Sequence, residues 1–432
     1  MEKFIVDGGI PLSGEMTPAG NKNATLPLLA ACLLTDEAVT LHNVPQIRDV
    51  RDMRLLLESL GVQVEDVDAT TWRITARELR PADLDPDVCR RIRASILLAA
   101  PMLVRAGGLR LPPPGGDVIG RRRLDTHIQA FRALGAEVDF DRAQLLFDFH
   151  APAQGLRGAF MLLDEASVLA TENAIMAAAL AKGTTIISNA ASEPHVQQLC
   201  DLLNTLGAQI SGIGSNTLTI QGVERLHGGE FTVGPDYLEV ISFVGAAVVT
   251  RGSIRVRKAG NQYLGMIRMV FNRMGVDWQV EDDDIIVPAQ QRLIVEPDLG
   301  NAIPEIKTNI WPAFPTDLMS IAIAVATQAQ GSILFHDWMY PSRMFFVDKL
   351  VGMGGQIVLC DPHRCIVTGP TQLFGEKVES PDIRAGMTLV LAALAAQGRS
   401  VIRNVGQIDR GYERVDEKLR ALGARIERQR EQ

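Results

Sequence analysis

A single pattern recurs six times along the 432 residues of this chain. Each copy opens with an Ala-rich segment that is apolar on nearly every side, such as "LPLLAACLL" at 26–34 or "ENAIMAAALA" at 172–181. A strand-like run follows, and then an amphipathic segment that ends in Leu-Gly or Met-Gly. Glycine is the residue most often found just beyond the end of a helix. These stops recur about every 70 residues, at Gly61, Gly135, Gly207, Gly275, Gly354 and Gly423.

The first segment of each copy is apolar around its whole circumference, so as a helix it must be buried on all sides. The second segment is amphipathic and can cover such a core from one side. We therefore expect an α/β fold in which helices form the interior and the strands lie outside. Three stops precede residue 210 and three follow residue 270, which predicts two domains of three copies each, with a boundary near 228–236.

Composition narrows the function classes. A net charge of −8 and a pI near 5.5 argue against a protein that binds nucleic acid or an anionic membrane. Five scattered cysteines suit a reducing compartment, and the close pair Cys360 and Cys365 has no second pair to complete a zinc site. No secretory signal opens the sequence, and the longest apolar run, "SILLAAPMLV" at 95–104, is too short to span a bilayer. We expect a cytoplasmic protein that holds no metal.

Many charged and polar side chains occupy two equivalent places in the repeat. One is the entry to the apolar segment, with Lys22, Asn23, Arg93, Ser167, Glu172, Asp236, Asp317, Asp382 and Arg384. The other is the loop before the amphipathic segment, with Asp117, Arg121, Arg122, Arg123, Arg343, Asp409 and Arg410. Helix N-termini attract anions, and added cations would repel one another unless a polyanion were bound. The pattern predicts a phosphorylated ligand; the alternative is that the acids are helix caps and the arginines are solvated.

Seven segments carry a resemblance to a known family. They are "AGNKNATLPLLAACLL", "RIRASI", "PGGDVIGRRRLDTH", "SVLATEN", "FPTDL", "PDIRAGMTLVLAAL" and "IDRGYERVDEKLRALGA". In order and spacing, the chain resembles the enolpyruvyl transferases essentially from end to end. The resemblance implies two inside-out α/β barrels joined by a hinge and closing over the substrates. The barrels it implies are residues 20–232, and residues 1–19 together with 233–432.

The resemblance also implies a reaction. In the members that the chain most resembles, the enolpyruvyl group of phosphoenolpyruvate moves to the 3′-hydroxyl of UDP-N-acetylglucosamine, and phosphate leaves. This is the first committed step of peptidoglycan synthesis. It is an addition followed by an elimination, and it needs a proton donor, a base and cations around the phosphate and carboxylate. No cofactor is implied. Both substrates are small molecules, and we expect a monomer.

The resemblance also implies roles for the residues of this sequence that match the family's motifs. The implied catalytic residues are Asp117 as proton donor, Asp317 as base for the sugar hydroxyl, Lys22 and Arg410. The residues implied to bind phosphoenolpyruvate are Lys22, Asn23, Arg122, Arg343, Arg384 and Arg410. Those implied to bind UDP-N-acetylglucosamine are Asn23, Arg93, Arg122, Arg123, Leu124, Asp125, Thr126, Glu165, Ala166, Ser167, Val168, Asp317 and Met339.

One departure concerns the chemistry itself. Most members carry a cysteine where this chain has Asp117, and that cysteine is also the target of fosfomycin; a minority carry aspartate. An aspartate has an ordinary pKa near 3.9 and a cysteine near 8.5, so Asp117 must be protonated in the closed complex to act as an acid. Because a carboxylate is a poorer nucleophile than a thiolate, we expect insensitivity to fosfomycin. The alternative role of Asp117 is a simple ion pair with Arg121 or Arg123.

Other departures leave the acceptor open. Leu169 replaces a glycine that lies against the nucleotide, Arg123 replaces a proline of the uridine-binding stretch, and Tyr237 stands where a charged residue is common. A related nucleotide sugar is therefore an alternative acceptor. Shikimate 3-phosphate is another, although "GNKNATLP" and "RIRASI" differ from that sister family. A catalytically silent relative is the third alternative.

Overall fold

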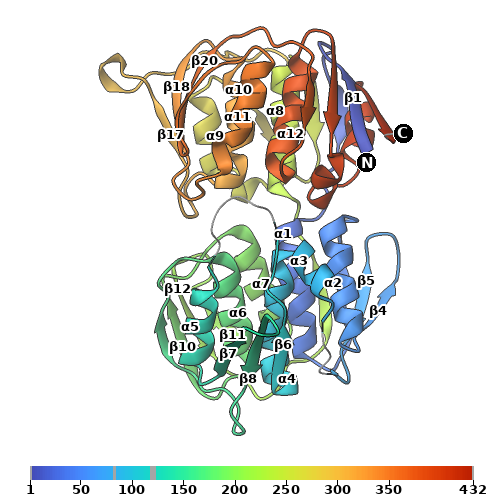
Figure 1. The fold of residues 1–432 in the computed structure, drawn as a ribbon, viewed down its shortest axis with the longest axis vertical. Helices are drawn as coiled ribbons and strands as arrows, with labels where there is room; N and C mark the ends of the chain where they lie inside the picture. Colours follow the sequence, from blue (N-terminus) through green and yellow to red (C-terminus); the bar gives the residue numbers. More distant parts are fainter. Residues whose placement is uncertain (1, 81–83, 117–122, 431–432) are drawn as a thin grey trace. The chain divides into compact units, whose positions relative to one another are not determined.

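The computed structural model describes residues 2–80, 84–116 and 123–430. These residues form two compact units (Figure 1). Of the described residues, we call 20–80, 84–116 and 123–234 the first unit, and 2–19 together with 235–430 the second unit. Among the described residues the strands make six sheets, three in each unit.

Two sheets of the first unit share one plan. A central strand pairs in parallel with one neighbour and in antiparallel fashion with a β-hairpin. One sheet has the order β13 (Gly229–Thr232), β3 (Val39–His42), β5 (Trp72–Thr75), β4 (Gln63–Asp66). Another has the order β9 (Phe160–Leu162), β10 (Thr184–Ser188), β12 (Thr217–Gln221), β11 (Gln209–Ser211). The third comprises, as described, β6 (Gly108–Leu111), β8 (Leu146–His150) and β7 (Glu137–Asp141).

The second unit has three four-stranded sheets, each with one parallel and two antiparallel pairings. Its first sheet has the order β2 (Ser13–Met16), β14 (Ser253–Val256), β16 (Asp284–Val287), β15 (Gln279–Glu281). Its second has the order β17 (Glu305–Lys307), β18 (Gly331–His336), β20 (Arg364–Gly369), β19 (Gln356–Asp361). Its third has the order β21 (Lys377–Glu379), β22 (Arg399–Arg403), β1 (Glu2–Asp7), β23 (Arg425–Arg430).

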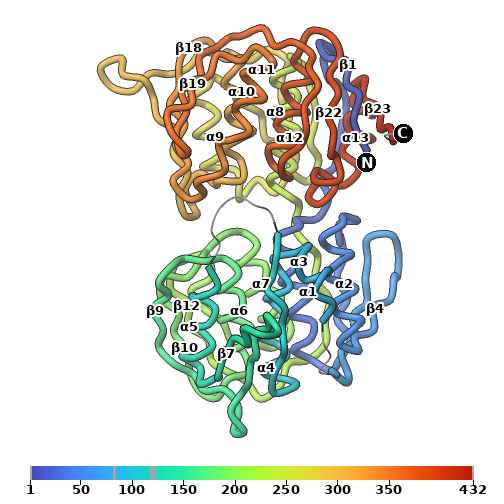
Figure 2. Tube along the Cα trace, in the orientation of Figure 1, coloured from blue at the N-terminus to red at the C-terminus, as the bar shows by residue number. Residues whose placement is uncertain are grey.

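The N-terminal strands complete two sheets of the second unit. Strand β1 lies between β22 and β23 and is antiparallel to both, with Phe4 opposite Ile402 on one side and Arg428 on the other. Figure 2 shows β1, in blue, beside these red strands from the end of the chain. Strand β2 fills the parallel position next to β14. Residues 2–19 therefore belong with the second unit because two of its sheets would otherwise lack a strand.

Each copy of the repeat contributes one inner helix. In the first unit these are α1 (Lys22–Ala31), η2 (Arg93–Leu98) continuing into α4 (Ala99–Ala106), and α6 (Val168–Ala179). In the second unit they are α8 (Tyr237–Val249), η5 (Thr316–Leu318) continuing into α10 (Met319–Ala326), and α12 (Ile383–Ala395). Every residue of α8 is buried, and so is nearly all of α12. The expectation of helices inside and sheets outside is confirmed.

The second segment of each copy forms an outer helix: α2 (Arg48–Ser59), α5 (Asp125–Ala133), α7 (Pro194–Thr205), α9 (Gly265–Asn272), α11 (Val347–Gly352) and α13 (Val415–Ala421). All six Leu-Gly or Met-Gly glycines adopt the positive φ that ends a helix without a Cβ clash. Their φ values run from 72° at Gly275 to 101° at Gly207. The remaining short helices are η1 (Cys32–Leu34), α3 (Pro86–Arg91), η3 (Asn261–Tyr263), η4 (Leu299–Asn301), η6 (Arg343–Phe346) and η7 (Val405–Arg410).

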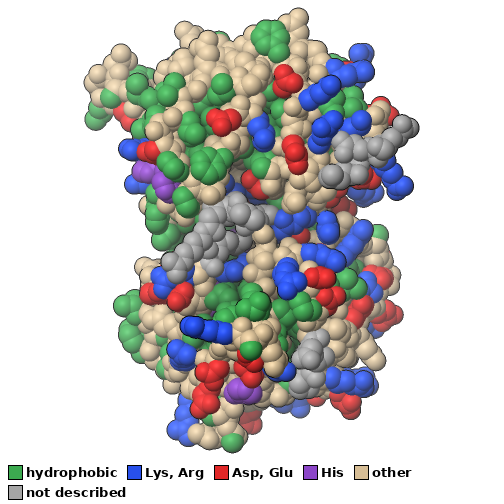
Figure 3. Space-filling view, viewed as in Figure 1, with side chains coloured by type: hydrophobic (Ala, Val, Ile, Leu, Met, Phe, Trp, Pro, Cys, Tyr) green, Lys and Arg blue, Asp and Glu red, His purple; other side chains and the backbone are tan. Residues whose placement is uncertain are grey.

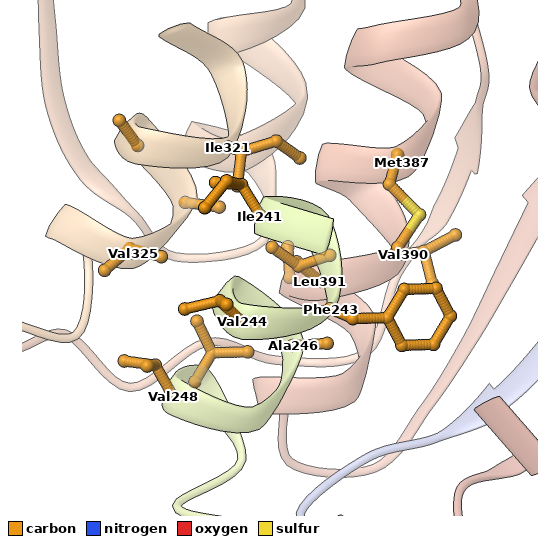
Figure 4. Close-up of a cluster of buried hydrophobic side chains, with 14 of the residues drawn as sticks. Ile241, Phe243, Val244, Ala246, Val248, Ile321, Val325, Met387, Val390 and Leu391 are labelled. Carbon is orange, nitrogen blue, oxygen red and sulfur yellow. The ribbon is translucent and has the colours of Figure 1, made fainter. Parts of the chain in front are cut away.

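The core of the second unit is the contact between its three inner helices. Figure 4 shows Ile241 of α8 beside Ile321 of α10, with Leu391 of α12 pointing into the same cluster. At Gly245 of α8 a Cβ atom would lie 2.8 Å from Leu391 Cδ2 and 3.1 Å from Ile321 Cγ2, so adding a side chain there would require these buried neighbours to shift. This packing fixes the three helices in register with one another.

Both signs of charge are interspersed over the viewed face of each unit (Figure 3). Within the part of the chain that the structure covers, no helix combines the length and apolar character needed to cross a bilayer.

We expect Leu391→Ala to lower the free energy of unfolding of the second unit by about 3 kcal/mol, because it leaves a cavity between fully buried helices. Urea unfolding measures the change. Leu299→Ala is the matched control, since Leu299 is 100% exposed and its truncation should change stability by less than about 0.5 kcal/mol. Equal losses in the two variants would contradict the packing described here.

Candidate active site

In the second unit, a carboxylate is held between two buried arginines. Asp317 opens the inner helix of its copy, and its Oδ1 accepts a hydrogen bond from Nη2 of Arg343 at 2.7 Å. Its Oδ2 accepts from Nε of Arg384 at 3.2 Å. Arg384 lies in the first turn of α12, and Arg343 lies in η6, between β18 and α11. The structure thus brings together one loop position and two helix entries of the repeat.

The two guanidiniums retain unused donors. Both arginine side chains are 5% exposed, yet Nε of Arg343 and Nη1 of Arg384 have no hydrogen-bond partner among the described residues. A buried N–H group without a partner is destabilising, because it has lost its hydrogen bonds to water and gained none from the protein. Burial by itself would lower the pKa of Arg384, but Tyr412, Asp317 and Asp236 hold that pKa above its ordinary value. These donors are therefore charged and suited to an anionic ligand.

Arg384 is supported from its other side by Tyr412. The Arg384 Cζ atom lies 5.4 Å from the centre of the tyrosine ring. The hydroxyls of Tyr412 and Ser242 are 2.8 Å apart, and Ser242 donates its own proton to the Leu238 carbonyl. The Tyr412 hydroxyl must then be the donor to Ser242. This chain of bonds ties the arginine to helix α8.

Asp337 fixes the backbone next to Asp317. It is fully buried and accepts hydrogen bonds from the hydroxyls of Thr308 and Thr316 and from the backbone N–H of Met339, the last at 3.1 Å. Thr316 directly precedes Asp317, and Met339 is one of the residues expected to meet the nucleotide sugar. Asp337 was not predicted from the sequence, although it follows a strand at an equivalent place in the repeat.

Arg410 is the last residue of the turn η7, which lies next to helix α12. Its Nη1 donates to Oε1 of Gln407 at 3.1 Å. A Cβ atom on Gly411 would lie 2.6 Å from Ile383 Cγ2, so the turn packs directly against the first turn of α12. The predicted residues Asp317, Arg343, Arg384 and Arg410 thus all lie around the entry to α12 or the elements packed on it.

In the first unit, Lys22 is the first residue of α1, where Asn21 caps the helix by accepting from the Ala24 N–H. The Lys22 ammonium lies 2.7 Å from Oδ2 of Asp49. Lys22 is 8% exposed and Asp49 3%, so the buried ammonium has a carboxylate beside it to balance its charge. Asn23, the next residue, is half-buried. Asp49 was not predicted from the sequence; it lies in the first turn of α2, one loop beyond a strand of the repeat.

The segments expected to bind the nucleotide sugar come together in the first unit. Arg93 donates to the carbonyls of Pro114 and Arg123, at 3.3 and 3.1 Å. Arg123 pairs with Asp125 and Asp164, and the Thr126 hydroxyl donates to Asp164 at 2.7 Å. Asp164, which the sequence analysis did not single out, therefore connects the 123–126 stretch to the segment Glu165–Val168.

Two buried titratable residues of the first unit, His127 and Glu172, lie near these segments. Burial, with Arg93 nearby, lowers the pKa of His127 to about 3, so its ring is neutral and Nδ1 accepts from Asn173 at 2.9 Å. Glu172 was expected among the charged residues at a helix entry. Instead it is fully buried within α6, and its carboxyl has no hydrogen-bond partner among the described residues. Burial and then Glu193 raise its pKa well above the usual range.

The predicted residues Asp117, Arg121 and Arg122 lie outside the described residues. Of the departures from the family pattern, Leu169 is partly buried against the core of the first unit, and Tyr237 is buried at the start of α8 with its ring centre 6.0 Å from that of Trp311. Across residues 2–80, 84–116 and 123–430, no three His, Cys, Asp or Glu side chains are grouped so as to hold a metal ion.

A family model described as EPSP synthase (3-phosphoshikimate 1-carboxyvinyltransferase) matches residues 6–419. The chain therefore belongs to the enolpyruvyl transferase family. Solved structures with this fold include the enolpyruvyl transferase NikO from Streptomyces tendae, with a TM-score of 0.88 at 24% identity over 99% of each chain. EPSP synthase from Acinetobacter baumannii has a TM-score of 0.78 at 17% identity over 100% of each chain.

Curated relatives carry a more particular name. UDP-N-acetylglucosamine 1-carboxyvinyltransferase from Bradyrhizobium diazoefficiens is 54% identical over 99% of this chain and 98% of its own. The enzyme of that name from Treponema denticola is 50% identical over 99% of both chains. The same name belongs to a Borreliella burgdorferi protein that is 48% identical over the full length of both.

We expect Asp49→Asn to lower the free energy of unfolding by about 3 kcal/mol, because it leaves the Lys22 ammonium buried without a counter-charge. Urea unfolding at neutral pH measures the loss. Asp52→Asn is the matched control one turn along α2: its partners Arg91 and Arg48 are 44% and 55% exposed and can be solvated. A loss in the control as large as in Asp49→Asn would show that the pair with Lys22 has no special weight.

Proposed function

We propose that this chain transfers the enolpyruvyl group of phosphoenolpyruvate to the 3′-hydroxyl of UDP-N-acetylglucosamine with release of phosphate, the first committed step of peptidoglycan synthesis. The observation that carries the proposal is the pair of unused guanidinium donors beside Asp317, since two buried arginines around one carboxylate suit an anionic substrate. Full-length relatives of about half identical sequence bear the name of this activity.

Phosphoenolpyruvate carries a carboxylate and a phosphate, and each can be bound by a guanidinium through two parallel hydrogen bonds. We assign Arg343, Arg384 and Arg410 to these groups, together with Lys22, Asn23 and Arg122. Support for this assignment comes from Arg384, whose guanidinium is held by Asp317 and Tyr412. Preorganised donors stabilise developing charge without reorganising during the reaction.

Asp317 is the proposed base. In the addition step, one of its oxygens takes the proton of the 3′-hydroxyl as the sugar oxygen forms a bond to C2 of the enol ester. The electron pair of the C2–C3 double bond takes a proton at C3. In the elimination step, the carboxylate that gave up its proton in the addition takes a C3 proton, the electron pair of that C–H bond restores the C2–C3 double bond, and the C2–O bond breaks so that its electron pair leaves with phosphate. Because Asp317 is held by Arg343 and Arg384, its orientation toward the hydroxyl is set by buried partners.

Asp117 is the proposed donor of the C3 proton. It must be protonated in the complex, so we expect activity to lean toward lower pH than in relatives with a cysteine at this position.

The acceptor is assigned to the segments gathered around Asp164. Arg93 and the 123–126 stretch are fixed to one another by hydrogen bonds, and Asp164 joins them to the start of α6. We propose that UDP-N-acetylglucosamine contacts Asn23, Asp317 and Met339 and the residues Arg93, Arg122, Arg123, Leu124, Asp125, Thr126, Glu165, Ala166, Ser167 and Val168.

We also propose that the protein works as a cytoplasmic monomer. The low, odd number of cysteines, none of them in a disulfide, fits a reducing compartment. Light scattering at micromolar concentration tests the oligomeric state.

Phosphate release tests the reaction. The chain should release phosphate from phosphoenolpyruvate only when UDP-N-acetylglucosamine is added, and Asp317→Asn should lower kcat about a thousandfold because the base is lost. Asp361→Asn is the control, since Asp361 forms a surface pair with Arg364 and its loss should leave kcat unchanged. Release only with shikimate 3-phosphate would assign the sister activity, and release with neither acceptor would assign a catalytically silent protein.

Fosfomycin tests the role of residue 117. The unmodified protein should form no covalent adduct, whereas Asp117→Cys should gain one, because a thiolate opens an epoxide that a carboxylate leaves intact. Intact mass spectrometry measures the adduct, with Asp117→Ser as the control for the position. If Asp117→Cys stays unmodified while it still turns over substrate, the assignment of this residue to the proton donor is wrong.

A further inference from the structure

Arg428, in the last strand of the chain, gathers carboxylates from three other elements. Its Nη1 and Nη2 donate to the two oxygens of Asp409 at 2.7 and 2.8 Å. Nη2 also donates to Asp416 in α13 at 2.8 Å, and Nη1 donates to Glu2 in β1 at 2.9 Å. The guanidinium carbon lies 4.8 Å from the ring centre of Phe4, its cross-strand neighbour. Its hydrogen bond to Asp409 is the largest of several effects that raise the pKa of Arg428 above its ordinary value.

This arrangement is stronger than an ordinary surface ion pair. The Arg428 side chain is 26% exposed and Asp416 only 7%, and the planar fork of an arginine matches both oxygens of Asp409 at once. The ring of Phe4 adds a cation–π contact on one face. Asp409 is thereby fixed in direction as well as in distance.

The residue so fixed comes directly before Arg410. Both belong to η7, whose other side packs against the inner helix α12: a Cβ atom on Gly386 would lie 2.7 Å from Ile408 Cγ1, and one on Gly411 would lie 2.6 Å from Ile383 Cγ2. The turn is thus held between the first turn of α12, which carries Arg384, and the guanidinium of Arg428. Neither contact involves the side chain of Arg410 itself.

We propose that Arg428 is a positioning residue for the reaction: through Asp409 it holds the turn that presents the Arg410 guanidinium to phosphoenolpyruvate. The proposal rests on the proposed function of Arg410. Arg428 does not touch substrate, and its effect is to restrict the orientations of Arg410 before binding. Small errors in the position of a binding group have large kinetic effects, so loosening this turn should weaken the use of phosphoenolpyruvate more than that of the acceptor.

Arg428→Lys keeps the charge but cannot form the two parallel bonds. We expect it to lower kcat/KM for phosphoenolpyruvate about tenfold, with KM for the acceptor unchanged. Asp409→Asn should give the same loss, and the double variant should lose no more than either single variant, because both remove one interaction. The matched control is Arg399→Lys, since Arg399 makes the same two-bond pair with Asp7 in the same sheet but does not contact η7 through any described hydrogen bond.

A structural readout accompanies the kinetics. Amide hydrogen exchange across residues 405–412 should be faster in Arg428→Lys than in Arg399→Lys. Equal kcat/KM for phosphoenolpyruvate in the two lysine variants, or equal exchange, would overturn the proposal. Should Arg428→Lys fail to fold, Asp409→Asn decides alone, and wild-type kinetics in that variant would overturn it. A wild-type chain that releases no phosphate would instead contradict the proposed function, while the exchange comparison would still test the positioning.

Discussion

Burial of the inner helices is the constraint on which the rest of this structure depends. Segments that are apolar on every face can reach a stable state only when surrounded, and here three of them pack together in each unit with sheets outside. In the second unit the packing is close enough that a Cβ atom at position 245 of α8 would require the Leu391 side chain to shift. Because the inner helices are packed so closely, the first turns of these helices hold charged side chains in defined positions.

In the second unit, the charged side chains at these helix starts can be buried at low cost because opposite charges lie beside one another. Asp317, Arg343 and Arg384 neutralise one another in part, and Asp337 fixes the backbone beside them. Asp382 caps α12 by accepting from the N–H groups of Arg384 and Ala385. In the first unit, Lys22 and Asp49 serve the same purpose with a single pair. Lys22, Asp49, Asp317 and Arg384 each lie in the first turn of a helix.

In the segment "IDRGY", neighbouring residues make contacts with different parts of the second unit. Asp409 binds Arg428, Gly411 allows close contact with α12, and Tyr412 supports Arg384. Arg410, between them, donates a hydrogen bond to Gln407. A motif that reads as a family signature in the sequence is therefore, in the structure, four successive residues with separate physical tasks.

The sequence by itself determined the repeat, the inner and outer helices, the six glycine stops and the family, because these depend on periodicity, on backbone conformation at single residues and on contiguous motifs. It also pointed to Lys22, Asp317, Arg343, Arg384 and Arg410 by their matching places in the repeat and by the family motifs. Only the tertiary structure decided which charges are paired. Asp49, Asp164, Asp337 and Arg428 escaped the sequence analysis, and Glu172 proved to be enclosed rather than placed at a helix entry. The physical reason is that a buried charge pairs with whichever opposite charge lies near it in space. Glu2 and Arg428 form such a pair across a sheet, and their separation in the sequence does not predict it.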